Sequence, residues 1–280
     1  MTRLASSNVK PLTAHGGTCI MVNLSSMGSL QLLFRPSKPR TLAELVQQWD
    51  SLAVLRAEQL DSSLDLSYFR VLVPSILNLI ADESLDLVLD AGCGVGALTP
   101  FLNQAGASVL GVDPSLLSIE EARKRHGHLA SFEACTIEEF ASGRCGGCSV
   151  VVANMVLMDT PDASSFVNAC RRALGPGGAL IATITHPCFW PIYKGYSTES
   201  WFHYEEEIFV EAPFTISLDR SVEALTTHVH RPLETYLEIL IRAGFLLEGL
   251  YEPGPPPDVR NIVSREWELP HFLALRARMP

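Results

Sequence analysis

The sequence predicts an α/β fold: a doubly wound, mostly parallel seven-stranded sheet with helices on both faces, Rossmann-like in layout. Three observations predict it. Short apolar stretches alternate with helical ones between residues 85 and 186, which is typical of a parallel sheet with helical crossovers. The first of these stretches ends in a glycine-rich loop, "DAGCGVGALT" (90–99). Two apolar stretches near the C-terminus indicate a closing antiparallel strand pair.

Each element follows from a local pattern. In 41–60, apolar residues recur every three or four positions, which predicts a helix capped by Thr41, with Glu44 completing a capping box. A second helical candidate covers 68–80, and Pro74 leaves its start open. Strands are expected at 85–90, 107–113, 130–135, 149–154, 179–186, 246–253 and 271–278. Helices are expected at 96–106, 115–127, 162–178 (ending in a turn) and 231–245.

Composition limits the possible partners. The chain has 280 residues, of which 47% are apolar, enough for one α/β domain with additions. It contains no apolar run of about 18 residues, so no membrane partner is expected. The net charge of -10 argues against a nucleic-acid partner. Seven scattered cysteines indicate free thiols in a reducing, cytoplasmic compartment. The oligomeric state stays open.

The first 40 residues differ from the rest. They contain no Asp or Glu, but several Arg, Lys, Ser and Thr residues. This composition fits a disordered extension or an organelle transit peptide, and the second reading implies an organellar location. We therefore assign residues 1–40 to an extension and residues 41–280 to the folded domain.

The glycine loop fits two different ligands. Gly92-x-Gly94-x-x-Ala97 suits a dinucleotide, and Gly92-x-Gly94-x-Gly96 suits S-adenosylmethionine. Asp90 directly precedes the glycines, and a carboxylate there would repel a pyrophosphate but attract an ammonium and a sulfonium. Asp113 ends the next strand, where it could bind the ribose hydroxyls of either ligand. S-adenosylmethionine is favoured. A nicotinamide-dependent oxidoreductase and a non-catalytic S-adenosylmethionine-binding protein remain alternatives.

Five segments occur in an order that resembles a known family. They are "VLDAGCGVGALTPFL", "GVDPS", "TIEEF", "VVANMVLMDTPD" and "ALGPGGALIATITHP". Together they resemble the class I S-adenosylmethionine-dependent methyltransferases, closest to the bacterial small-molecule branch. The resemblance covers about residues 41–278. It implies S-adenosyl-L-methionine as cofactor, and methyl transfer to an O, N or C nucleophile of a small organic acceptor.

The resemblance also implies which residues contact the cofactor. Four loop residues would border the methionine moiety: Asp90, Gly92, Cys93 and Gly94. Asp113 would bind the ribose and Pro114 would pack near the adenine. Thr136 and Ile137 would face the adenine, although the acid or serine that the family often has is replaced by Thr136. Asn154 and Met155 would flank the methionine part and open towards the acceptor.

Histidine and cysteine residues suggest further chemistry. His186 ends the fifth expected strand, at the ligand-binding edge, where it could act as a general base or only shape the pocket. Cys145 and Cys148 form a CxxC. Together with His186 and Cys188 they could suggest a zinc site, but Cys148 begins its strand and His186 ends the next one, about 17–20 Å away at roughly 3.3 Å per residue. No metal is therefore predicted. "CGGC" is interpreted as a turn, with a redox pair as the alternative.

Residues 187–232 break the alternation of strands and helices. Nine of the 22 aromatic residues fall between 189 and 214. They could form a lid over a small organic substrate or a core for an irregular insertion. We predict a substrate lid at 187–232, and structural roles for His228 and His230.

Overall fold

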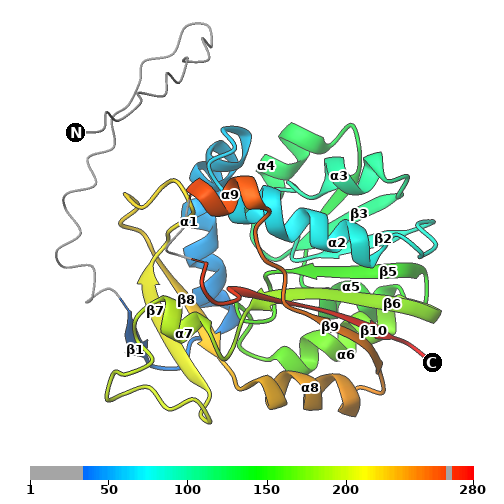
Figure 1. The fold of residues 1–280 in the computed structure, drawn as a ribbon. Helices are drawn as coiled ribbons and strands as arrows, with labels where there is room; N and C mark the ends of the chain where they lie inside the picture. The colour runs from blue at the N-terminus through cyan, green and yellow to red at the C-terminus, as the bar shows by residue number, and fades with distance from the viewer. Residues whose placement is uncertain (1–33, 263–266) are drawn as a thin grey trace, which may run out of the picture. The chain divides into compact units, whose positions relative to one another are not determined.

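The computed structural model describes residues 34–262 and 267–280, which belong to one compact unit. Its main sheet has seven strands in the order β4-β3-β2-β5-β6-β10-β9 (Figure 1). The strands are β2 (Val88–Ala91), β3 (Val109–Asp113), β4 (Ser131–Ala134), β5 (Cys148–Asn154), β6 (Leu174–Thr185), β9 (Leu246–Tyr251) and β10 (Phe272–Arg278). The first five are parallel, and β10 runs antiparallel to both β6 and β9. The predicted sheet and its closing strand pair are confirmed.

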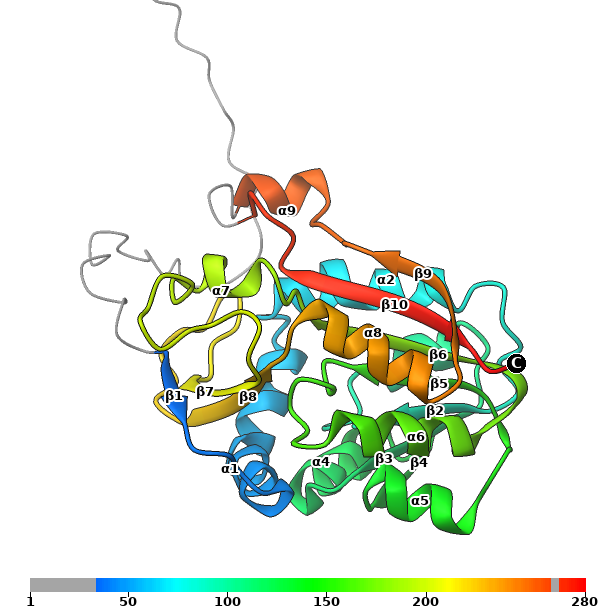
Figure 2. The ribbon, with the colours of Figure 1, turned by 90° about the horizontal axis from the view of Figure 1, so that it is seen from below.

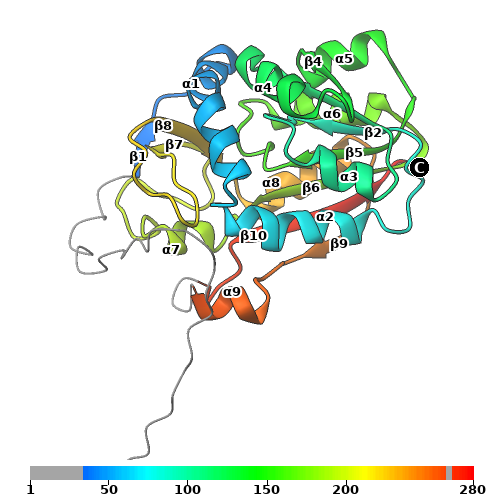
Figure 3. The same cartoon turned by 90° about the horizontal axis from the view of Figure 1, so that it is seen from above.

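Helices cover both faces of this sheet. One face carries α2 (Val73–Leu79), α3 (Thr99–Gln104) and α4 (Leu116–His126), and the other carries α5 (Ile137–Gly143), α6 (Ala163–Ala173) and α8 (Leu233–Arg242). Figure 2 shows the second group and Figure 3 the first. Among the described residues, none of the helices is both long and apolar enough to span a bilayer.

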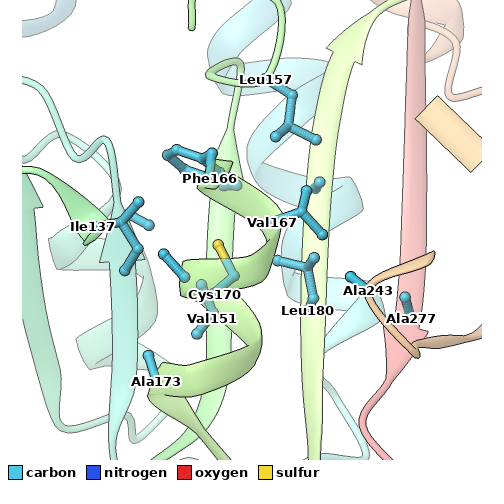
Figure 4. Close-up of a cluster of buried hydrophobic side chains, with 14 of the residues drawn as sticks. Ile137, Val151, Leu157, Phe166, Val167, Cys170, Ala173, Leu180, Ala243 and Ala277 are labelled. Carbon is cyan, nitrogen blue, oxygen red and sulfur yellow. The ribbon is translucent and has the colours of Figure 1, made fainter. Parts of the chain in front are cut away.

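The core follows the two-residue period of the strands. In β5, Val151 faces the α5–α6 layer, whereas Val150 and Val152 face the α2–α3 layer. Figure 4 shows the first cluster, in which Phe166 and Val167 of α6 pack over the sheet. Strands buried on both faces are continuous apolar runs, which is how the sequence could locate β2, β5 and β10.

Helix α1 (Leu42–Asp61) begins as predicted, with Thr41 and Glu44 forming the reciprocal capping box. The second helical stretch splits at the proline. A π-helical turn, η2 (Tyr68–Leu72), precedes α2, and the N–H of Val73 donates to the carbonyl of Tyr68. Pro74 is the second residue of α2, a position near a helix start where proline is tolerated.

Two local predictions differ from the structure. The stretch 174–178, expected as a turn, is extended, because β6 already begins at Leu174 opposite Cys148. Gly177 has a φ of +73° within this stretch. Helix α3 is shorter than expected, because Gly94 and Gly96 hold left-handed backbone conformations before it.

A second, three-stranded antiparallel sheet was not predicted. It pairs β1 (Arg35–Ser37), β7 (Ile208–Pro213) and β8 (Leu225–His230), and it carries the short helix α7 (Trp190–Tyr193). Glu211 of β7 is 5% exposed and forms ion pairs with Arg35 and Arg40. Residues 34–40 therefore belong to the folded unit, which corrects the predicted boundary at residue 40. Residues 1–33 lie outside the described residues. Near the C-terminus, α9 (Pro257–Ile262) separates β9 from β10.

Candidate functional site

The strand order reverses between β2 and β5, and ligands of open α/β sheets bind at the carboxyl ends of the strands at such a point. The glycine loop leaves β2 at this point. Gly92 has a φ of +78°, and a Cβ there would lie 2.5 Å from Cγ2 of Val156. Gly94 has a φ of +51°, and a Cβ there would meet no atom within 4 Å. Gly92 is thus required by packing, whereas the backbone at Gly94 is open on the side where a ligand could approach.

Asp90, the next-to-last residue of β2, has a carboxylate oxygen without a hydrogen-bond partner among the described residues. Its side chain is 1% exposed, and its buried Oδ2 has no hydrogen-bond partner within the described part of the chain. Burial, and then the nearby charge of Asp113, raises the pKa of this carboxyl to about 7. A buried acceptor without a partner is costly, so it indicates a donor that the chain itself does not supply. An ammonium group would fit this position.

Asp113 orients two loops. Its Oδ2 accepts from the N–H of Gly94 at 2.9 Å, and its Oδ1 accepts from the N–H of Ser115 at 2.8 Å. Burial raises the pKa of Asp113 to about 6, against the lowering effect of these two hydrogen bonds. Each carboxylate oxygen keeps a further acceptor lone pair, so binding to ribose hydroxyls stays open. Pro114 follows Asp113 directly and is half-buried.

The end of β5 supplies the opposite wall. Met155 has a φ of +60°, a strained conformation for a residue other than glycine, and such strain often marks functional sites. Its N–H donates to the carbonyl and the hydroxyl of Thr183, whose hydroxyl in turn donates to Oδ1 of Asn154 at 2.7 Å. This network fixes Asn154 and Met155 at the predicted edge of the crevice.

Three residues that were predicted to contact the cofactor have side chains that contribute to packing or to helix capping. Cys93 packs with Phe132 beneath the loop, and burial raises the pKa of its thiol well above the usual range. Thr136 caps α5 through a capping box with Glu139. Ile137 is 3% exposed and lies in the core between α5 and α6 (Figure 4). Ile137 could reach a ligand only through its backbone, and contacts of all three with the cofactor stay predictions.

Both ring nitrogens of His186 form hydrogen bonds. Its Nδ1 accepts from the N–H of Cys188 at 3.2 Å, so Nε2 carries the proton and donates to Glu252 at 2.9 Å. The ring is 2% exposed and lies 4.5 Å, between centroids, from the ring of Phe189. A base role at His186 would require the hydrogen bond from Cys188 to break.

The aromatic segment largely packs against itself. Tyr196 is 2% exposed, and its ring stacks on Phe34 and Trp201 with centroids 5.2 and 5.5 Å apart. Burial, together with His230 and Lys194, lowers the pKa of His228 to about 3, so its ring is neutral at neutral pH. A small pocket beside these rings is lined by His186, Tyr196 and His228. These aromatic residues therefore form a small core, as expected for an insertion.

The cysteines of "CGGC" are both free thiols, Cys145 at the surface and Cys148 buried in β5. In the described ranges, no cluster of three His, Cys, Asp or Glu side chains is suited to a metal ion.

Sequence reasoning missed three residues near the loop. Asp50 of α1 accepts from the hydroxyl of Ser115 at 2.6 Å and so joins α1 to the loop after β3. Arg56 and Tyr68 lie on the same side of the site, with the guanidinium carbon 5.8 Å from the phenol centroid. They sit on a helix and a π turn whose spacing indicates only packing, so no local signal could have identified them.

Comparisons with known proteins agree with this geometry. Residues 89–182 match the family model of a methyltransferase domain. A ubiquinone biosynthesis O-methyltransferase from Bordetella avium is 37% identical over 94 residues, which cover 32% of this chain and 39% of that protein. This chain thus spans about two fifths of the length of that relative.

Two solved structures share the fold. One is an S-adenosylmethionine dependent methyltransferase from Mesorhizobium loti, with a TM-score of 0.54 and 20% identity over 73% of this chain and 96% of that one. The other is a 1,6-didemethyltoxoflavin-N1-methyltransferase from Burkholderia thailandensis, with bound S-adenosylhomocysteine. Its TM-score is 0.56, with 18% identity over 88% of this chain and 94% of that one. The match to a methyltransferase domain over residues 89–182 and the shared fold both agree with the predicted resemblance to class I S-adenosylmethionine-dependent methyltransferases.

Proposed function

We propose that this chain transfers a methyl group from S-adenosyl-L-methionine to an O, N or C nucleophile of a small organic molecule. The family match over residues 89–182 and the relative from Bordetella avium support this proposal. The observation that carries it is the buried, unpartnered Oδ2 of Asp90 beside an open glycine turn. A carboxylate there suits the cationic methionine end of this cofactor and opposes a pyrophosphate.

In this proposal each residue of the site has its own role in binding the cofactor or the acceptor. Asp90 in its ionised form attracts the ammonium and sulfonium charges, and Asp113 accepts from the ribose hydroxyls while it holds the loop at Gly94. Asn154 and Met155 form the wall that opens towards the acceptor. The cofactor supplies a methyl group already activated by the sulfonium. The chain contributes in-line positioning and exclusion of water, which together can supply up to about 7–11 kcal/mol.

A base role for His186 also stays a prediction. It applies only to an acceptor that must lose a proton, since a carboxylate acceptor needs no base. Both ring nitrogens of His186 are engaged, so a positioning role at the end of β6 agrees better with the contacts. Unchanged turnover of His186→Ala at saturating acceptor would contradict the base role.

Calorimetric titration tests the proposed function. The protein is titrated separately with S-adenosylmethionine, S-adenosylhomocysteine and NAD(H). We expect saturable binding of the first two and its loss in Asp113→Ala. Binding of NAD(H) alone would favour the oxidoreductase alternative, and tight cofactor binding without product across acceptor panels would favour the non-catalytic one.

The compartment belongs to this proposal as well. The six cysteines of the described residues are all free, which supports a reducing compartment, either the cytoplasm or the interior of an organelle.

A further inference from the structure

Asp159 has a carboxylate without a partner in the described part of the chain. It lies between β5 and α6, is only partly accessible to water, and forms neither a side-chain hydrogen bond nor an ion pair there. Burial raises its pKa to about 8. By contrast, Asp162 of the same loop caps α6, with its Oδ1 accepting from the N–H of Ser165 at 2.8 Å. A carboxylate removed from water without a donor is unfavourable, so Asp159 indicates a donor or a cation from outside the chain.

The turn that carries Asp159 packs against the glycine loop. The N–H of Asp159 donates to the carbonyl of Val156 at 2.7 Å. Val156 lies so close to the glycine loop that a Cβ at Gly92 would be 2.5 Å from its Cγ2. The two residues between them, Leu157 and Met158, are buried in the core. Asp159 therefore lies one turn away from the residue that contacts the loop proposed to bind the methionine end of the cofactor.

Asp159 also lies near the small pocket at the end of β6. Tyr236 of α8 lines this pocket together with Thr185 and His186. Burial raises the pKa of Tyr236 to about 12, Arg231 opposes this rise, and the charge of Asp159 adds to it. Such an effect requires the carboxylate to be close to the phenol, because charge interactions weaken with distance. The carboxylate thus lies between the proposed cofactor loop and this pocket.

The backbone on both sides of Asp159 is held by the second sheet. The N–H of Val229 in β8 donates to the carbonyl of Met158 at 2.6 Å. Arg231, which is 2% exposed, donates from Nη2 to the carbonyl of Thr160 at 2.9 Å. These two bonds fix the residues directly before and after Asp159. A group positioned in this way loses little conformational entropy when it meets a ligand.

An unpaired carboxylate at this place suits proton transfer from a methyl acceptor. We propose that Asp159 faces the transferred methyl group and accepts the proton of an acceptor O–H or N–H. The lone pair of the acceptor atom forms the new bond to the methyl carbon, the carbon–sulfur bond breaks with its electron pair staying on sulfur, and the proton passes to Asp159. The sulfonium and the carboxylate both become neutral, so the step creates no charge in a site shielded from water. This inference rests on the proposed function and narrows it, because the reacting atom of the acceptor must carry a proton.

Asp159 meets the requirements of a base better than His186 does. Both ring nitrogens of His186 are engaged in hydrogen bonds, whereas the carboxylate of Asp159 has no partner among the described residues. A base is most effective when its pKa lies near the working pH, and burial brings the pKa of Asp159 to about 8.

Sinefungin tests the position of Asp159 without an acceptor. In this analogue of S-adenosylmethionine, a carbon with an amino group replaces the methylated sulfur, so its ammonium stands where the methyl group would lie. Its affinity is compared with that of S-adenosylhomocysteine, by calorimetry, in the wild type and in Asp159→Asn. The wild type should prefer sinefungin. Asp159→Asn should reduce this preference about 10- to 100-fold, the usual range for a charge-assisted hydrogen bond, and should bind S-adenosylhomocysteine as the wild type does. Asp162→Asn is the matched control, because it removes the same charge from the same loop and keeps a capping side chain.

Turnover tests the proton transfer itself. Catechol, tyramine and histamine are offered as acceptors with S-adenosylmethionine. With each one that the wild type methylates, Asp159→Asn should lower kcat at least about 100-fold and change KM little, because the base acts in the transition state. An unchanged kcat in Asp159→Asn would overturn the proton transfer.

The affinities also show which proposal fails. The position of Asp159 is overturned if the wild type does not prefer sinefungin, or if Asp159→Asn keeps the preference. An equal loss of affinity for both compounds overturns it too, because it would indicate a general effect on the loop, and thermal unfolding of each variant checks the fold directly. If the wild type binds neither compound, the proposed function itself fails, whatever Asp159 does.

Discussion

Asp90 combines two properties that conflict in the protein without ligand. Its carboxyl is almost inaccessible to water, and its pKa is raised to about 7 by burial and by Asp113. The same carboxylate lies where a cationic ligand would neutralise it. A residue that only stabilised the loop would accept hydrogen bonds from loop amides, as Asp113 does. We therefore expect the ionised side chain of Asp90 to lower the stability of the unliganded protein while it favours the binding of a cationic ligand.

We predict that Asp90→Asn stabilises the unliganded protein at pH 8. The pKa of Asp90 is higher in the folded state than the ordinary value of about 3.9, so the folded state binds more protons between about pH 4 and 7. Stability therefore falls as pH rises through this window, by about 4 kcal/mol at most, at 1.36 kcal/mol per pKa unit. Asparagine carries no charge at any of these pH values, so the variant should not lose this stability as the pH rises. Urea unfolding at pH 4.5 and pH 8 measures it, with the exposed Asp82→Asn as control.

Cofactor affinity should change in the opposite direction. Asp90→Asn should bind S-adenosylmethionine more weakly, and wild-type affinity should fall as pH drops below about 7, because protonated Asp90 no longer attracts a cation. A loss of stability in Asp90→Asn at pH 8 would show instead that this side chain supports the loop.

At the scale of elements, the loop between β7 and β8 attaches the second sheet to α1 and to the residues just before η2. The hydroxyls of Ser67 and Ser217 are 3.0 Å apart, and the N–H of Ser67 donates to the hydroxyl of Ser217. Phe214 of this loop also packs edge-on against Trp49 of α1, with centroids 5.6 Å apart. Polar contacts hold much of this loop, among them the hydrogen bond from Nε2 of Gln59 to Asp219 at 2.8 Å, and such contacts are typical of segments that open locally. It is the part of 187–232 best placed to serve as the predicted lid.

A disulfide between positions 67 and 217 tests the lid. The two hydroxyls are close enough for Ser67→Cys and Ser217→Cys to form one without large backbone movement. If the loop must open for the cofactor to exchange, oxidation should slow S-adenosylhomocysteine release at least about tenfold, and reductant should restore it. Stopped-flow fluorescence measures the release rate. Ser67→Cys alone is the control for oxidation of native cysteines. Equal rates in the oxidised and reduced protein would contradict a lid.

At the scale of the whole molecule, residues 34–40 complete the second sheet. The strand β1 adds to β7, and Arg35 and Arg40 surround the buried carboxylate of Glu211 at 2.5 and 2.6 Å. Removing the cationic partners of a buried carboxylate is strongly destabilising. These few residues therefore matter for stability although they lie outside the methyltransferase motifs.

Two truncations measure this contribution. A chain that starts at residue 41 loses both arginines and β1, whereas a chain that starts at residue 34 keeps them. We expect the shorter chain to unfold at lower urea concentration, with a free energy of unfolding about 3 kcal/mol smaller, as for a buried ion pair that loses one side. If the two chains are equally stable, the folded domain begins after residue 40, as the sequence predicted.

Much of the main sheet and part of the site could be predicted from local sequence. Buried parallel strands are continuous apolar runs, and the helix at 41–60 carries its own capping box, so short windows of sequence suffice to find them. The glycine loop with Asp90 and Asp113 follows from the same logic, since both acids lie near the carboxyl ends of neighbouring parallel strands, which meet at one edge of the sheet.

Tertiary structure decided the rest. The pairing of β1 with β7 joins residues more than 170 positions apart, and no local period records it. The hydrogen bond between Nε2 of His186 and Glu252, and the position of Arg56 beside the ring of Tyr68, likewise depend on segments distant in the chain. Local sequence fixes which residues are apolar and where the backbone turns. Which polar atoms are left without a partner, and so await a ligand, depends on what the folded chain brings beside them.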